Sequence, residues 1–184
     1  FIDRPIISVV LPSSVITLEG RTEGTFDNVS RTFHGCWQLT SINLFNTAIS
    51  VLPKWTFWSA KLGTIVLPGT LTKIDQGCFE SSQLTSIDIP NSVTTIEQYS
   101  FFRCKNLTKV ILGNSLTLIG NGAFAESSIL NEIVITKGSL PITNLGVDNP
   151  FRDVSPSFTI KAPKVVLENY KSGWSALSGK IIGY

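Results

Sequence analysis

The sequence predicts an α/β repeat solenoid, and three observations lead to this prediction. One apolar pattern starts again at residues 39, 62, 84, 107 and 130, which is a period of 22 or 23 residues. Each copy opens with apolar positions that alternate with polar ones, as a half-buried strand requires. A phenylalanine also recurs at one position of the copies, as Phe33, Phe57, Phe79, Phe101, Phe124 and Phe151. Because no copy can bury its apolar face alone, stacking of the copies must supply the core.

The 184 residues are expected to form a single domain of six repeats and a C-terminal segment. The first repeat is longer than the others because a polar, Gly-containing insertion at about residues 19–31 interrupts it. The repeats are assigned to residues 6–38, 39–61, 62–83, 84–106, 107–129 and 130–157, and the C-terminal segment to residues 158–184. We expect one parallel β-sheet on the concave face and a mostly irregular convex face.

The elements follow one another in the same order within each repeat. A strand comes first, and a proline ends it at positions 12, 68 and 90, where no backbone donor is needed. The second repeat departs from this pattern because Phe45 stands in the proline position. A small hydroxyl side chain follows, which can bond the backbone of the turn. The phenylalanine comes last and is expected to fill the interior from the opposite wall.

The motif L-T-x-I-x-I-P-x-S-V-x-x-I at residues 84–96, followed by Ser100-Phe101 and Cys104, resembles the BspA-like leucine-rich repeats. The resemblance covers roughly residues 6–135 and implies a leucine-rich-repeat right-handed superhelix. Residues 158–175 are similar to the cap that closes such arrays, with a short helix that Gly173 is expected to end. The family resemblance further implies a secreted or surface-anchored protein of a host-associated bacterium, with adhesion to host or microbial proteins. It carries no ligand-binding residues over to this chain.

Composition and charge argue against several other functions. The net charge of +2 is spread without a basic run, so no nucleic-acid partner is expected. No stretch approaches the ~20 apolar residues of a transmembrane segment. The cysteines (Cys36, Cys78 and Cys104) occupy columns of small residues and are expected to face the interior as free thiols. His34 can be drawn beside Cys36, but the two side chains should point in opposite directions. We therefore expect no catalytic residues, no metal and no cofactor.

Two surfaces are candidates for ligand binding. Aromatic residues near the phenylalanine column can form an exposed patch or can cover neighbouring repeats; they are Trp55, Trp58, Tyr99, Phe102 and Trp37. The concave face offers Thr85, Asp88 and Lys109 among mostly neutral, hydroxyl-rich positions. The preferred interpretation is a non-catalytic module that binds a protein or glycan ligand outside the cell or on its surface. The alternatives are a structural spacer of a larger surface protein and, ranked lowest, an enzyme or enzyme inhibitor.

Overall fold

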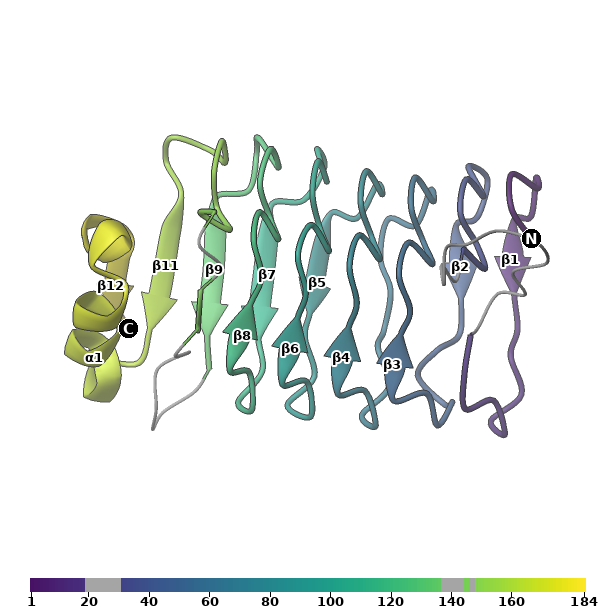
Figure 1. Cartoon of the computed structure of the whole chain (residues 1–184), viewed down its shortest axis with the longest axis horizontal. Coiled ribbons are helices and arrows are strands. Elements are labelled where there is room, and N and C mark those ends of the chain that lie inside the picture. The colour runs from purple at the N-terminus through teal and green to yellow at the C-terminus, as the bar shows by residue number, and fades with distance from the viewer. Residues whose placement is uncertain (19–30, 137–143, 146–147) are drawn as a thin grey trace.

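The computed structural model describes residues 1–18, 31–136, 144–145 and 148–184. Figure 1 shows successive coils stacked along one long axis, with β1 near the N-terminal end and helix α1 at the opposite end. The predicted insertion at about residues 19–31 lies outside the described residues except for Arg31. The stack of coils agrees with the repeat solenoid predicted from the period of 22 or 23 residues.

One side of the coil, here named the long-strand face, carries parallel strands from successive repeats. These strands are β1 (Ser8–Val9), β2 (Ser41–Ile42), β5 (Ser86–Asp88), β7 (Lys109–Leu112), β9 (Glu132–Ile135), β11 (Thr159–Ala162) and β12 (Ile181–Gly183). The last five form one sheet, whereas β1 and β2 form a separate pair. Equivalent residues are in register, so that Ile87, Val110 and Ile133 follow one another across the sheet. The predicted parallel sheet is present, although the third repeat interrupts it.

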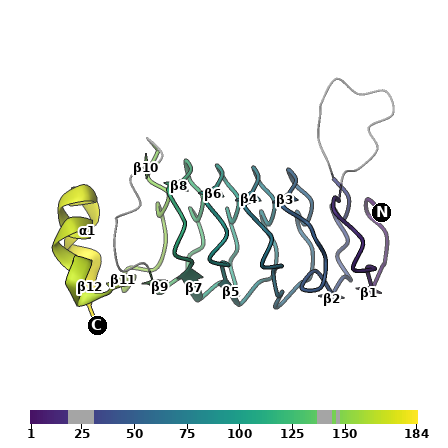
Figure 2. The same cartoon turned by 90° about the horizontal axis from the view of Figure 1, so that it is seen from below.

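A second parallel sheet runs along another side of the coil, here named the short-strand face (Figure 2). Its five strands are β3 (Val51–Leu52), β4 (Lys73–Ile74), β6 (Thr95–Ile96), β8 (Leu118–Ile119) and β10 (Asn144–Leu145). The expectation of a mostly irregular convex face was therefore wrong for this side. Strands of two residues are too short to show alternation in the sequence. They form because each pairs with its equivalents in the repeats before and after it.

The turns that carry the phenylalanine column form a third side, here named the turn face, and it too is hydrogen-bonded from repeat to repeat. In one repeat the backbone N–H groups of Trp55, Phe57 and Ser59 donate to the carbonyl oxygens of Gln76, Cys78 and Glu80, at 3.0, 2.8 and 2.9 Å. Trp55 and Ser59 have positive φ values, of 51° and 55°. This left-handed backbone is uncommon for residues other than glycine. Its recurrence shows that packing between repeats sets the conformation of the turns.

The core is a stack of phenylalanine rings along the solenoid axis. Neighbouring rings from Phe1 through Phe33 to Phe151 have centroids 5.0 to 5.7 Å apart and nearly parallel planes. Strand spacing of about 4.8 Å brings equivalent rings to this separation. All six rings of the predicted column are buried. Phe1 extends the stack by one ring and is itself 66% exposed.

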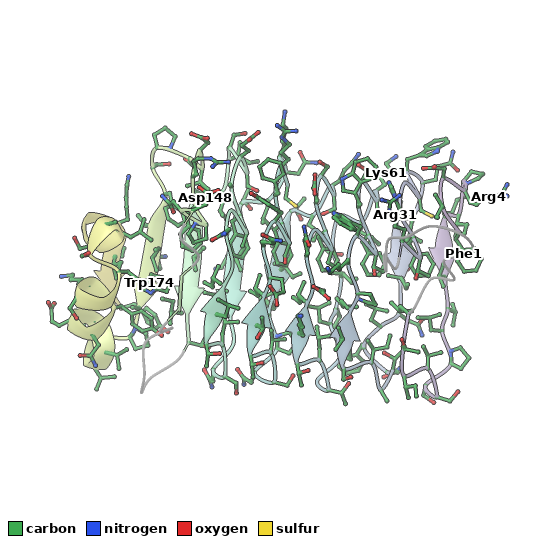
Figure 3. All side chains as sticks on the ribbon, viewed as in Figure 1. Phe1, Arg4, Arg31, Lys61, Asp148 and Trp174 are labelled. Carbon is green, nitrogen blue, oxygen red and sulfur yellow. The ribbon has the colours of Figure 1, made fainter. Side chains whose placement is uncertain are left out.

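The C-terminal segment meets the last ring of the stack. It contains the 3₁₀ helices η1 (Lys164–Val166) and η2 (Ser175–Lys180), helix α1 (Leu167–Gly173) and strand β12. The Phe151 ring lies 5.4 Å from Phe158 and 6.3 Å from Trp174, and Tyr170 is fully buried beside Trp174. Figure 3 labels Phe1 and Trp174, which lie toward opposite ends of the solenoid. Helix α1 ends at Gly173, where the sequence predicted its end.

Candidate binding surfaces

Two of the candidate aromatic rings on the turn face pack against glycines of the next repeat. A Cβ atom placed on Gly122 would stand 2.7 Å from Cε1 of Tyr99 and 2.9 Å from Cδ1. The ring of Trp55 lies even closer to the corresponding position on Gly77. Trp55, Gly77, Tyr99 and Gly122 occupy the same column and all have positive φ. The column thus alternates an aromatic ring with a glycine that makes room for it, and both rings are half-buried.

The neighbouring aromatic column is also engaged by side chains of the protein. The Trp58 ring is 4.2 Å from the imidazole of His34 in an edge-on arrangement. The Phe102 ring lies 5.5 Å from Tyr99, and the guanidinium carbon of Arg103 stands 4.7 Å from its centroid. Both rings are half-buried. The structure therefore brings Trp58 and Phe102 into contact with their neighbours and leaves part of each ring open.

Glu80 links the aromatic residues of the turn face electrostatically. Burial raises the pKa of its carboxyl group, while hydrogen bonds from the side chains of Trp58 and Trp55 and the nearby charge of Arg103 oppose that rise. Arg103 also forms an ion pair with Glu126 at 2.8 Å. Glu80 and Arg103 thus both have partners within the protein.

Trp37 differs from the other aromatic candidates because 57% of its surface is exposed. The neighbouring Cys36 is fully buried, as are Cys78 and Cys104, so the prediction that all three thiols face the interior is confirmed. Burial raises the pKa of Cys104 to about 12. The Cys36 thiol donates a hydrogen bond to the carbonyl oxygen of Phe1. These buried thiols are poor nucleophiles because the reactive form is the thiolate.

Two of the three candidates on the long-strand face already have partners in the structure. The Thr85 hydroxyl donates to the carbonyl oxygen of Gly63 at 3.1 Å, as part of a column of such bonds between repeats. Lys109 pairs with Glu132 at 2.8 Å. Glu132 also pairs with Lys161 at 2.6 Å, and the hydrogen bonds from the two lysines lower the pKa of its carboxyl group. Asp88 is exposed, and no side-chain partner is found for it among the described residues.

The third repeat creates a hollow on the long-strand face beside Asp88. Residues 64–66 lie in no strand, although the equivalent residues of the next three repeats do. The hollow has a volume of about 310 Å³ and lies between this segment and the fourth repeat. Its lining residues are Thr64, Ile65, Val66, Leu67, Ser86, Ile87, Asp88, Ile89 and Pro90. The sequence pointed to Asp88 but not to the hollow. The one signal it offered is Gly63, which replaces the threonine found in the neighbouring repeats.

The described part of the chain contains no group of three or more His, Cys, Asp or Glu side chains that could hold a metal ion. In the same residues, no helix has the length and apolar character needed to cross a membrane. A second hollow, of about 430 Å³, lies on the turn face beside Arg103 and Lys105. The arrangement as a whole is that of a rigid surface with shallow hollows, which can recognise a partner by shape and hydrogen bonding.

Parallel sheets, a 22- or 23-residue period and a continuous ring stack define a leucine-rich-repeat solenoid. The chain belongs to the BspA type leucine rich repeat family, whose model matches residues 27–146 in six copies. Proteins of this family are typically non-catalytic. Comparison with curated proteins finds no match.

Solved structures of bacterial leucine-rich-repeat proteins resemble this fold. A leucine-rich repeat protein from Bacteroides ovatus is 22% identical, with a TM-score of 0.61, over 85% of this chain and 45% of its own. The pneumococcal vaccine antigen PcpA is 20% identical, with a TM-score of 0.54, over 74% of this chain and 39% of its own. A leucine rich cell surface protein from Faecalibacterium prausnitzii is 17% identical, with a TM-score of 0.42, over 71% and 49%. The chain thus spans less than half the length of these proteins.

Proposed function

We propose that this chain is a non-catalytic module that binds a protein ligand through its long-strand face, at the surface of a bacterial cell or outside it. The observation that carries the proposal is the difference between the two candidate surfaces. On the turn face, four of the five aromatic candidates pack against neighbouring side chains or glycines. On the long-strand face, Asp88 and the adjoining hollow remain open.

Rigidity supports the same proposal. On the long-strand face, strands β1 and β2 pair before the third repeat and strands β5, β7, β9, β11 and β12 pair after it. Beneath this face, most apolar side chains of the core are fully buried. A surface that is already ordered loses little conformational entropy when a partner binds. Extended repeat surfaces of this kind are common protein-binding sites.

The location and the role in adhesion rest on the family. The family resemblance supports a surface protein. Within this proposal, residues 1–184 act as one right-handed module, and residues 158–184 cap its C-terminal end by covering Phe151 with Trp174. The capping role agrees with the general need of solenoids for a terminal unit that covers the open core.

Binding to immobilised host matrix proteins and mucin glycans, measured by biolayer interferometry, tests the proposal. A double variant, Thr64→Lys with Val66→Glu, changes two exposed side chains of the long-strand face. Its matched control, Trp58→Ala with Phe102→Ala, changes the turn face. We expect the first variant to abolish binding of a protein ligand and the second to retain it.

If the turn-face variant loses binding and the long-strand-face variant retains it, the aromatic residues of the turn face form the binding site. Binding to glycans alone would make this a carbohydrate-binding module. Failure to bind any member of the panel would favour the spacer, the alternative function that the sequence allows. Circular dichroism of both variants establishes that loss of binding is not loss of folding.

A further inference from the structure

The hollow on the long-strand face results from an interruption in the hydrogen bonding between two repeats. Among the described residues, the bond from the Thr85 N–H to the Gly63 carbonyl, at 2.9 Å, is the sole backbone hydrogen bond between residues 62–67 and 84–90. By contrast, β7 and β9 are paired in register over four residues each. The third and fourth repeats are thus in contact through their buried side chains, while their backbones on this face are not joined beyond residue 63.

This interruption leaves backbone donors and acceptors available at the surface. In a parallel strand, alternate residues direct their N–H and C=O groups to the same neighbour. Strand β5 bonds to β7 on one side, so its groups on the other side, at Ser86 and Asp88, face the hollow. The backbone of Ile65 and Leu67 borders the hollow from the third repeat. Unpaired strand edges of this kind are sites where extended peptides add by main-chain hydrogen bonding.

The side chains around the hollow indicate which peptide it would accept. Val66 is 63% exposed and offers an apolar contact. The Thr64 hydroxyl is exposed and that of Ser86 is half-buried. Asp88 supplies a negative charge, and in the described residues no lysine or arginine pairs with it, whereas Glu132 on the same face pairs with two lysines. The Asp88 carboxylate is therefore open to a cationic group of a ligand.

We infer that this hollow binds an extended peptide segment of a protein partner, with a Lys or Arg side chain of the peptide paired to Asp88. The inference rests on the proposed function and specifies its ligand. The peptide backbone bonds to the free groups of the third and fourth repeats, and apolar side chains of the peptide contact Val66. A glycan fits less well because no aromatic ring lines the hollow to pack against a sugar.

The probe is an acetylated and amidated hexapeptide of alternating Thr and Val with one central Lys, and its control has Glu in place of Lys. Titration of the ¹⁵N-labelled protein with up to about 5 mM peptide covers the weak affinities expected of a short ligand. We expect saturable shifts of the amide signals of Ile65, Leu67, Ser86 and Asp88. The Glu peptide should bind about two- to fivefold more weakly, which is the size of one exposed ion pair.

The variant Asp88→Asn should remove this preference for Lys over Glu, and Glu168→Gln, an exposed acid on α1, should preserve it. Thermal unfolding of both variants establishes that they remain folded. The inference is overturned if the peptide gives no saturable shifts, if the shifts lie elsewhere, or if Asp88→Asn keeps the preference. Shifts of the same amides by a mucin oligosaccharide but not by the peptide would also overturn it.

Failure of the inference and failure of the proposed function give different results. If the Thr64→Lys, Val66→Glu variant loses a protein ligand while the peptide fails to bind, the long-strand face is a protein-binding surface without the peptide site. If the peptide binds at the hollow while the panel gives no partner, the peptide site stands and the adhesion partners proposed above are wrong.

Discussion

Replacement of Gly122 by alanine tests whether Tyr99 is a packing residue of the turn face. The new Cβ would stand 2.7 Å from Cε1 of Tyr99, well inside van der Waals contact, so the ring must move. Gly122 also has φ of 56°, which costs an alanine about 1–2 kcal/mol. Displacing the ring weakens its edge-on contact with Phe102, worth about 0.5–1.5 kcal/mol. The two effects together predict a loss of about 1.5–3.5 kcal/mol of unfolding free energy.

Urea unfolding followed by circular dichroism and tryptophan fluorescence measures this loss, which corresponds to about 3–14 °C in Tm for a chain of this size. In a Tyr99→Ala background the same Gly122→Ala change should cost about 1–2 kcal/mol, since only the backbone penalty remains. The control is Gly63→Ala, where nothing lies within 4 Å of the added Cβ and φ is not positive. We expect the control to change stability by less than about 0.5 kcal/mol.

Two results would contradict the packing argument. If Gly122→Ala costs the same with and without the Tyr99 ring, the ring does not depend on the glycine. If it costs no more than Gly63→Ala, then neither the backbone conformation nor the close approach matters for stability. Either result would mean that Tyr99 is again a candidate for contact with a ligand.

Two other predictions concern the ring stack and the half-buried carboxyl group of Glu80. Phe101→Ala should lower the free energy of unfolding, measured in urea, by about 3–5 kcal/mol, because this fully buried ring is stacked between two neighbours at 5.2 and 5.0 Å. A loss below about 1 kcal/mol would mean that the ring stack is not the core. Glu80→Gln should raise stability at pH 7, because burial raises the folded-state pKa of Glu80 and its ionised form therefore destabilises the fold. That gain in stability should shrink as the pH falls through the raised pKa. It should disappear below the ordinary pKa of glutamate, about 4.3, where the wild-type carboxyl group is protonated in both the folded and the unfolded state. A gain that grows toward acid pH would contradict the direction of the pKa shift.

The repeat, the ring column and the inward direction of the cysteines were predictable because they depend on residue type alone. A large apolar side chain that returns every 22 or 23 residues can be buried only if successive coils align it. The column from Phe33 to Phe151 follows from that requirement. The same reasoning identified Phe45 as a departure from the strand-ending proline, and in the structure its side chain is 63% exposed.

The hydrogen bonding of the turn face was not predictable. Trp55, Ser59 and Arg103 adopt positive φ, which their side chains disfavour in isolation. They do so because each N–H finds a carbonyl in the next repeat, as Ser59 does with Glu80. Such a conformation is stable only in the assembled stack, so no local pattern reports it.

The candidate binding residues also fall into a part that the sequence predicts and a part that depends on contacts between repeats. The sequence named Asp88, Thr85 and Lys109 because they lie at outward positions of predicted strands, and outward positions follow from alternation alone. The sequence could not show that the Thr85 hydroxyl bonds the previous repeat or that Lys109 is paired across the sheet. Nor could it show that Asp88 has no side-chain partner among the described residues. That distinction depends on which side chains of neighbouring repeats lie opposite one another.

The period of the solenoid, the composition of its core and the family of the chain can be read from the sequence, because all three are properties of residue type at regular spacing. Three features are visible only in the folded chain: the short-strand face is a sheet, Tyr99 packs on Gly122, and the third repeat stays apart from the fourth beside Asp88. The physical reason is that these features are contacts between repeats. Their energy depends on the fit of two surfaces across the stack, which a one-dimensional pattern does not contain.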